Sequence, residues 1–335
     1  MSQKLLIATL GTAPAVITEA IDLLGEQGVR PDGVILFLTQ DREVQESLEL
    51  LSQHLPAHDN ITWIDPVYVA AYTDITDSES AVEFMREACR ILKTYRDNGD
   101  RLFVSIAGGR KAMSSLLALA VQFYGAERLF HIWAPPWIEE EGEIAALRRI
   151  PQEQLTEKLH PRLVNMPDSD RPRLVDLPFI GLFPLLGDIL GALKGQTISA
   201  RDLRQTLVAT GLLTSQGEPT PLGQKVAAIL EGVEGLPPAR QEECKIHIGQ
   251  HHHRDKLQRF AQELSGRFPF ITEIRSEEWR QGTEQVRLQL PNVLVVGHRL
   301  GTDILFRLHL TTTASTPGQL EAARRDVEKY IAQRR

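Results

Sequence analysis

Short apolar runs alternate with segments of helical periodicity along the first half of the chain. Residues 4–10 and 33–39 are apolar almost throughout, whereas in residues 15–25 apolar positions recur every three or four residues. Parallel strands are buried on both faces, so this alternation predicts a parallel sheet with helices on both sides, a Rossmann-like α/β fold over about residues 1–150. The expected strands are 4–10, 33–39, 61–64, 102–106 and 128–133, and the expected helices are 15–25, 41–54, 78–96 and 112–124.

The pattern changes in the middle of the chain. Residues 166–172 are rich in Pro and Asp, which is typical of a linker. Two short helices are expected beyond it, over 199–209 and 221–231, with a glycine-containing turn between them. Helix, turn and helix in this order resemble a winged helix, or alternatively a block that connects or dimerises. We therefore assign residues 166–238 to a linker and a winged-helix-like α module.

A third pattern follows the breaker at residues 235–238. Strand-like runs and two amphipathic helices predict a small α+β domain over residues 239–335. The expected strands are 243–248, 270–274, 286–290, 293–296 and 304–310, and the expected helices are 254–264 and 317–333.

Composition adds a charge asymmetry to this picture. The 335 residues are 42% hydrophobic and 24% charged, which excludes disordered, collagen-like and coiled-coil chains. The net charge is −7, yet residues 240–335 carry 16 Arg and Lys against 12 Asp and Glu. A basic segment on an acidic chain suggests a part that meets an anion such as nucleic acid.

Cysteine usage and hydropathy bear on the compartment. Cys89 and Cys244 make no disulfide framework, and no 18-residue apolar stretch is present. The apolar run at the start is too short for a signal peptide. We expect a cytoplasmic protein with no membrane partner, and we interpret the apolar residues 177–193 as buried or interface structure.

Two polar loops follow strands of the predicted parallel sheet. Gly11-Thr12 ends the first strand, and the segment from Ser105 to Lys111 ends a later one. In an open α/β sheet, ligands bind beyond the carboxyl ends of the strands where the strand order reverses. Glycines allow backbone N–H groups to approach an anion, and a helix N-terminus favours negative charge. Neither a GxGxxG motif nor a P-loop is present, so these loops predict a different anion site.

The residues of these loops carry a family resemblance. LLIATLGTAPAVITEAI together with LFVSIAGGRKAMSSLLALA resembles the CARF family, the CRISPR-associated Rossmann-fold sensors. The resemblance implies a CARF sensor domain over 1–165 and a homodimer that binds a cyclic oligoadenylate, most often cyclic tetra-adenylate, across its two-fold axis. This ligand is an activator, and no cofactor is expected. The contacts implied by the resemblance are Gly11, Thr12, Ser105, Gly108, Gly109, Arg110 and Lys111.

A second resemblance lies in the basic tail. Residues 292–299, NVLVVGHR, with the strands before and after them, resemble RelE-type mRNA interferases. The resemblance implies a metal-independent endoribonuclease that cleaves mRNA in the ribosomal A site, so mRNA and the ribosome are the expected partners. It implies phosphate contacts for Arg287 and Arg299 and proton transfer for His298. Arg307 is a further candidate, and His309 shares its strand face because alternate residues point the same way.

Together these features predict a CRISPR type III accessory effector in the order CARF, winged helix and RelE-like domain. Three alternatives stay open: a ring nuclease that degrades the cyclic oligoadenylate, a transcription regulator that uses the winged helix, and a HEPN ribonuclease. The last is suggested by the spacing from Arg240 to His247. No metal site is expected, because the three consecutive histidines 251–253 cannot all face one ion.

Overall fold

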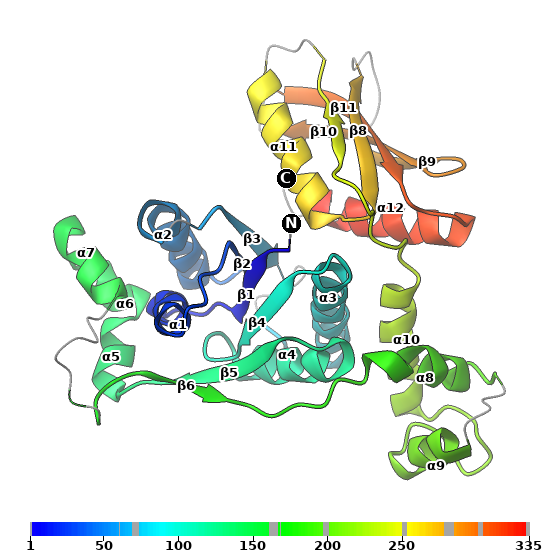
Figure 1. The fold of residues 1–335 in the computed structure, drawn as a ribbon, viewed down its shortest axis with the longest axis horizontal. Helices are drawn as coiled ribbons and strands as arrows, with labels where there is room; N and C mark the ends of the chain where they lie inside the picture. The colour runs from blue at the N-terminus through cyan, green and yellow to red at the C-terminus, as the bar shows by residue number, and fades with distance from the viewer. Residues whose placement is uncertain are drawn as a thin grey trace. The chain divides into compact units, whose positions relative to one another are not determined.

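The computed structural model describes residues 2–59, 61–68, 74–160, 167, 169–196, 201–249, 253–277, 285–300 and 304–332. The chain divides into two compact units, Met1–Ile229 and Leu230–Arg335, called unit 1 and unit 2 below. Each unit contains its own sheet (Figure 1).

Unit 1 contains a six-stranded sheet in the order β3-β2-β1-β4-β5-β6. Strands β1 to β5 are parallel, as the apolar runs predict, and β6 is antiparallel to β5. The strand order reverses between β1 and β4, because the chain proceeds outward to β3 on one side and to β5 on the other. The strands are β1 (Lys4–Thr9), β2 (Gly33–Leu38), β3 (Trp63–Tyr68), β4 (Arg101–Ser105), β5 (Arg128–Trp133) and β6 (Arg173–Asp176).

Helices cover both faces of this sheet (Figure 1). Even-numbered apolar residues of β1 and β2, such as Leu6 and Val34, belong to one buried cluster with residues of α1 and α2. Odd-numbered residues point the other way, and Phe37 packs on Phe84 of α3 with ring centroids 5.3 Å apart. The sheet is therefore the middle layer of three, as expected. These helices are α1 (Ala15–Glu26), α2 (Arg42–His58), α3 (Ser78–Asp97) and α4 (Lys111–Tyr124).

Several shorter elements of unit 1 lie outside the predicted pattern. They are α5 (Pro136–Glu141), α6 (Ile144–Leu147), α7 (Gln152–Leu159), the 3-10 helix η1 (Phe183–Leu185) and α8 (Leu186–Leu193). Within the apolar stretch 177–193, Ile189 and Leu193 are buried, whereas the Ile180 side chain is 75% exposed. The stretch is thus core in one part and surface in another.

The module after α8 contains the two helices expected there, α9 (Arg201–Ala209) and α10 (Pro221–Glu234). An isolated antiparallel bridge between Leu213 and Pro219 closes the turn between them, and Gly217 in that turn has a φ of +88°. This left-handed conformation favours glycine. The winged-helix assignment stays a prediction.

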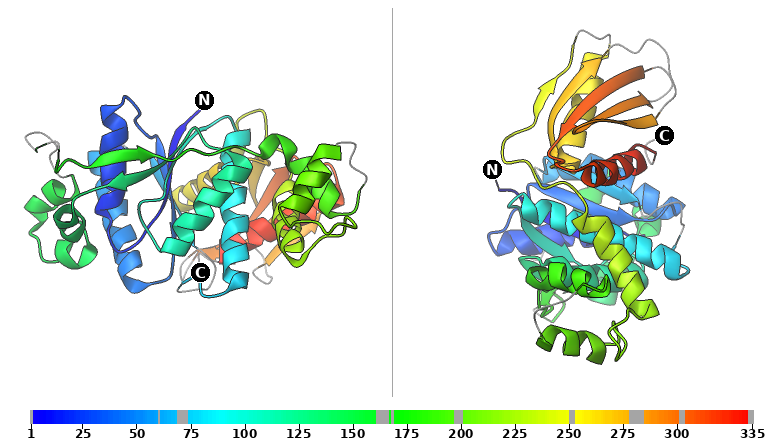
Figure 2. Two further views of the ribbon diagram at one scale, coloured as in Figure 1. Left: turned by 90° about the horizontal axis from the view of Figure 1, so that it is seen from below. Right: turned by 90° about the vertical axis from the view of Figure 1, so that its right-hand side faces the viewer.

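Unit 2 is an α+β unit with a five-stranded sheet in the order β7-β8-β11-β10-β9 (Figure 2). Strand β7 runs parallel to β8, and the other pairs are antiparallel. Its core joins one sheet face to both helices, for example Phe306 and Leu308 to Phe260 and Val327. The elements are β7 (Lys245–His247), α11 (Arg254–Arg267), β8 (Ile271–Glu277), β9 (Gln285–Gln289), β10 (Val293–Leu300), β11 (Ile304–Thr312) and α12 (Pro317–Ala332).

The described helices include none that combines the length and the apolar character that crossing a bilayer requires.

Candidate functional site

Two glycine-containing loops of unit 1 meet where the strand order reverses. One follows β1 and the other follows β4, the two strands that pair in parallel at this point. A Cβ added to Gly11 would lie 3.0 Å from the backbone nitrogen of Gly109, so the two loops are in backbone contact. The structure thus brings together the two sequence segments proposed to bind one ligand.

Three glycines allow this contact. A Cβ on Gly108 would overlap the carbonyl oxygen of Thr9, and one on Gly109 would lie 2.7 Å from the Thr9 Cβ. Gly109 also has a φ of +76°, which L side chains rarely adopt. The loop after β4 can therefore pack against the end of β1 only because Gly108 and Gly109 have no side chains.

Hydrogen bonds of serine and threonine hydroxyl groups hold these loops in shape. The side chains of Thr9 and Ser114 both donate hydrogen bonds to the Gly108 carbonyl, the second at 2.9 Å. Ser105 is fully buried, and its hydroxyl accepts the Ala107 N–H at 3.4 Å. Thr12 is half-buried, and its carbonyl accepts the Ile144 N–H at 2.7 Å. Ser105 therefore shapes the loop from the interior, while Thr12 lies at the surface.

Arg110 and Lys111 provide positive charge at the N-terminus of α4. Both side chains are exposed, and Arg110 is the N-cap residue of a helix that has no side-chain cap hydrogen bond. The Arg110 guanidinium is 3.4 Å from Asp41 and 3.6 Å from Asp74. Because Arg110 is already close to two carboxylates, the backbone N–H groups at the helix start and the charge of Lys111 are what this site offers an anion.

The open face of the unit 2 sheet carries the arginines of the basic tail. Val295 of β10 pairs with Arg287 on one side and with His309 on the other, and Gly297 pairs with Arg307. Residues paired in register point to the same sheet face, as do alternate residues of one strand. Arg287, Arg299, Arg307 and His309 therefore share the face opposite the helices. We call it the open face.

The charge of the open face is mainly positive. Among the described residues, five Arg and Lys side chains share this face with two carboxylates. Each carboxylate is already paired, Glu273 with Arg275 at 2.9 Å and Glu277 with Arg307 at 3.5 Å. The cations are Lys245, Arg275, Arg287, Arg299 and Arg307, and the carboxylates are Glu273 and Glu277.

A Glu–His pair lies beside Arg307. His309 Nε2 is 2.9 Å from Glu277 Oε2, and this hydrogen bond together with the charges of His309 and Arg307 holds the pKa of Glu277 below its usual value. His298 pairs in register with Phe306 of the core, so its position in β10 belongs to the helix-covered face and not to the open face; its side chain lies outside the described residues. His247 of β7 lies on the same face as His309, with its Nε2 3.4 Å from Glu273 Oε1, so two histidines of the open face have a carboxylate beside them.

The HEPN alternative does not agree with this unit. Its signature belongs to a helical domain, whereas Arg240 and His247 lie in a loop and on β7 of an α+β unit. The Arg240 guanidinium donates a hydrogen bond to the Ser265 carbonyl at 3.0 Å, and burial lowers its pKa. Arg240 also lines a surface pocket of about 690 Å³ together with Lys245 and Arg275. The Arg240 side chain therefore holds the loop before β7 against the C-terminal end of α11.

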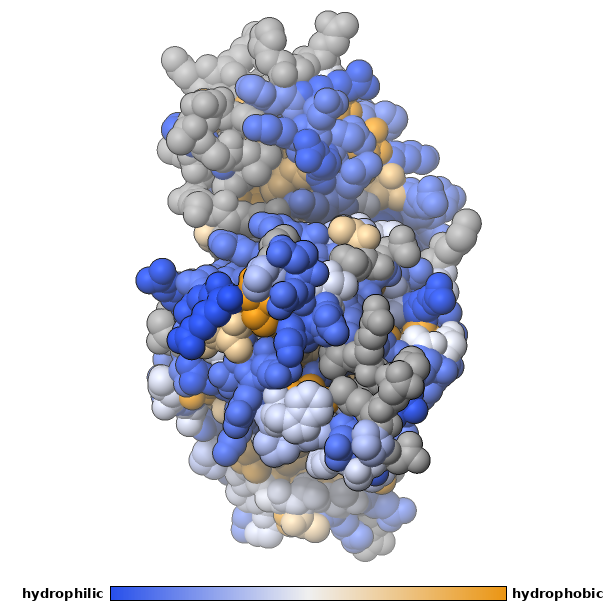
Figure 3. Space-filling view, turned by 90° about the vertical axis from the view of Figure 1, so that its left-hand side faces the viewer, coloured by the Kyte–Doolittle hydropathy of each residue, from blue (hydrophilic) through white to orange (hydrophobic). Residues whose placement is uncertain are grey.

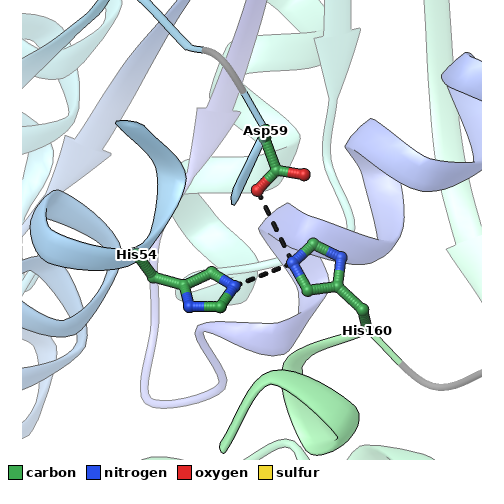
Figure 4. A group of neighbouring side chains, drawn as sticks. All are labelled: His54, Asp59 and His160. Carbon is green, nitrogen blue, oxygen red and sulfur yellow. Dashed lines mark hydrogen bonds and ion pairs between the residues drawn. The ribbon is translucent and has the colours of Figure 1, made fainter. Parts of the chain in front are cut away.

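His54, Asp59 and His160 form a cluster that the sequence did not predict (Figure 4). About a hundred residues separate His160 from the other two, so no local spacing could have indicated it. Burial alone would lower the pKa of His160, but its hydrogen bond to Asp22 and the charges of Asp22 and Asp59 raise it above the usual value. Of the three histidines 251–253, only His253 lies within the described residues.

The fold and the switch-point loops define unit 1 as an open α/β domain with a candidate anion site. Residues 13–211 match the model of the CRISPR-associated protein NE0113 family. This match spans more than half of the chain, so the protein belongs to that family. The expected association with CRISPR is thereby confirmed. No curated protein matches the sequence.

Two solved structures show distant likeness. Csm6 of Enterococcus italicus, bound to cyclic hexa-2′-fluoro-hexa-dAMP, is 13% identical with a TM-score of 0.41, covering 69% of this chain and 54% of that chain. The chain therefore spans about half the length of that protein. Protein VC1899 from Vibrio cholerae is 9% identical with a TM-score of 0.29, covering 92% of this chain and 77% of that one. At these TM-scores neither likeness bears on fold or function.

Proposed function

We propose that this protein is a CRISPR effector in which a cyclic oligoadenylate, bound by unit 1, controls a ribonuclease in unit 2. The observation that carries the proposal is the contact between the two glycine loops, which places Arg110 and Lys111 beside the reversal point of the sheet. A CRISPR-associated chain with this anion site and a separate basic sheet face has the parts that a ligand-controlled nuclease requires.

The ligand would be an anion with several phosphates. Phosphate oxygens accept hydrogen bonds from backbone N–H groups at the α4 N-terminus, and Lys111 adds a point charge. Thr12, half-buried at the surface, would contact a ribose or phosphate oxygen. Gly11, Gly108 and Gly109 contribute by close backbone approach, and Ser105 contributes by holding the loop in shape.

A second copy of the chain completes the proposed sensor. A cyclic oligoadenylate is symmetric, so two copies of one loop pair can bind it at once across a two-fold axis. Lys111, Ser115 and Leu119 lie one helical turn apart along the exposed side of α4, and Leu119 is 53% exposed. An exposed leucine on a stripe that starts at the ligand loop supports a contact between two α4 helices.

The proposed reaction of unit 2 is RNA cleavage by an internal nucleophile. The ribose 2′-oxygen attacks the adjoining phosphorus, the bond to the 5′-oxygen breaks, and a 2′,3′-cyclic phosphate and a 5′-hydroxyl result. Arg287, Arg299 and Arg307 stabilise the extra negative charge on the phosphate. One proton leaves the 2′-hydroxyl and another is delivered to the departing 5′-oxygen, so no metal is needed.

Two histidines are candidates for proton transfer. His298 is the candidate from the RelE resemblance, although its register with Phe306 assigns its position to the helix-covered face, whereas His309 is held by Glu277 on the arginine-bearing face. The contact with Glu277 Oε2 fixes the orientation of the His309 ring beside Arg307. His309 is therefore the proposed group for proton transfer to the leaving oxygen, and comparison of His298→Ala with His309→Ala tests it against His298.

The proposal is tested by measuring RNA cleavage and ligand consumption together, with cyclic tetra-adenylate, with a linear tetra-adenylate and with no ligand. Cleavage that requires the cyclic ligand supports the proposal, and comparison of translated with free mRNA tests the ribosome. Loss of the ligand without RNA cleavage would instead identify a ring nuclease. If RNA and ligand both stay intact while ligand-dependent DNA binding appears, the protein would be a transcription regulator.

A further inference from the structure

The cluster of His54, Asp59 and His160 lies in unit 1, away from the glycine loops. Helix α2 starts after the carboxyl end of β2, at the sheet edge where the loops lie, and runs away from that edge. His54 lies near the far end of α2, and Asp59 directly follows the helix. His160 follows the end of α7. The three side chains point toward one another from these two places (Figure 4).

The ligand atoms of the cluster are spaced as around a single ion. His54 Nε2 and His160 Nε2 are 2.9 Å apart, within hydrogen-bond distance, and Asp59 Oδ2 forms an ion-pair contact of 3.5 Å with the same His160 nitrogen. All three atoms lie within 4.8 Å of one another. Tetrahedral zinc with bonds of about 2.0–2.1 Å places neighbouring ligand atoms about 3.3 Å apart, close to both measured separations.

Asp22 of α1 supplies a second, independent indication. Its Oδ2 is 2.9 Å from His160 Nδ1, so the Nδ1–H donates to the carboxylate. In the neutral imidazole this leaves the Nε2 lone pair directed at the cluster. Metal-binding histidines commonly donate their other N–H to a carboxylate, which fixes the tautomer and the ring orientation.

Burial is consistent with a fixed site. The side chains of Asp59 and His160 are 10% and 17% exposed, and His54 is buried. The side of the molecule that carries α5 to α7 is otherwise mainly hydrophilic, with scattered apolar residues (Figure 3). Two imidazoles and a carboxylate removed from water in this way are well suited to a divalent transition metal ion.

We propose that His54, Asp59 and His160 bind one divalent transition metal ion of the Zn²⁺ type, with a water molecule in the fourth position. Imidazole and carboxylate ligands suit this class of ion, and three protein ligands leave one position open. The ion joins the end of α2 to the end of α7, and through Asp22 it also engages α1. Its effect is to stabilise the attachment of α7 to the rest of unit 1.

The test uses the full chain, first treated with a chelator and then given Zn²⁺ alone. Bound zinc is measured after gel filtration, and thermal unfolding is recorded with and without zinc. We expect one zinc per chain and a zinc-dependent rise in melting temperature for the wild type and for His131→Ala, an exposed histidine on β5. His54→Ala and His160→Ala should lose that zinc and that rise.

Zinc bound elsewhere and misfolding of a variant can both be distinguished from loss of the proposed site. The variants retain the consecutive histidines 251–253, so adventitious zinc on them contributes equally to every sample. If removal of a ligand prevents folding, Asp22→Asn is the second variant, and its zinc affinity should fall about 10- to 100-fold. Equal zinc content in wild type and His54→Ala, or no bound zinc in the wild type, would overturn the proposal.

Discussion

The candidate ligand site of unit 1 is made mainly of backbone, whereas the open face of unit 2 is made of side chains. In unit 1, three glycines and the hydroxyls of Thr9, Ser105 and Ser114 shape a loop pair to which Arg110 and Lys111 add the charge. In unit 2, arginine side chains stand on one face of a sheet whose other face holds the core. Substitutions of the loop glycines of unit 1 should therefore affect folding and binding together, whereas substitutions of the exposed cations of either site should affect binding or activity alone.

The largest expected effect is on RNA cleavage. Arg287→Ala or Arg299→Ala should each lower the cleavage rate about 100-fold or more, because each removes a cation from the phosphate in the transition state. Both arginines are exposed, so the melting temperature should stay unchanged. The matched control is Arg254→Ala on α11, the helix that covers the opposite sheet face. An equal loss in the control would contradict the assignment of the open face.

Glu19 of α1 makes the stability of unit 1 depend on pH. Burial, with the charges of Glu139 and Asp22, raises its pKa from 4.5 to about 7. This shift corresponds to about 3 kcal/mol of unfolding free energy, present below pH 4.5 and lost as the pH rises to about 7. Glu19→Gln should therefore stabilise the protein at pH 8 and have little effect at pH 4. Chemical denaturation at both pH values measures this, and an equal effect at both would contradict it.

Gly108 tests the backbone construction of the ligand site. Gly108→Ala should lower the unfolding free energy by about 1–3 kcal/mol, because its Cβ overlaps the Thr9 carbonyl oxygen. Ligand affinity, measured by calorimetry, should fall with it. Gly25→Ala within α1 is the control, since nothing lies within 4 Å of the added Cβ. That change should be neutral or stabilise by about 0.5–1 kcal/mol.

Substitution of Lys111 tests how much the positive charge of the same site contributes to ligand affinity when the loop shape is unchanged. Lys111→Ala should weaken cyclic tetra-adenylate binding about tenfold without lowering the melting temperature, because the side chain is exposed. The difference should shrink as salt is added, since salt screens exposed charges. Arg101→Ala, at the start of β4 and thus at the other end of that strand, should bind as wild type. Unchanged affinity in Lys111→Ala would remove this residue from the site.

The local hydrophobic pattern predicts most strands and helices of this molecule. It does not predict contacts between residues that are distant in the sequence. The long strands and helices of both units follow from apolar periodicity, as the alignment of residues 33–39 with β2 illustrates. Helices α5 to α7 are too short for periodicity to be distinctive. The glycine loops were predictable because strand ends meet at one sheet edge. The Glu277–His309 pair and the His54–Asp59–His160 cluster were not, since each joins residues distant in sequence.

The most direct test of the central claim is RNA integrity in a reconstituted translation reaction, with and without cyclic tetra-adenylate. It compares the wild type with Arg299→Ala and Lys111→Ala. We expect cleavage by the wild type only when ligand is present, and no cleavage by Arg299→Ala at any ligand concentration. Lys111→Ala should cleave at full rate once about tenfold more ligand is supplied. Cleavage that is independent of ligand, or that survives Arg299→Ala, would contradict the account.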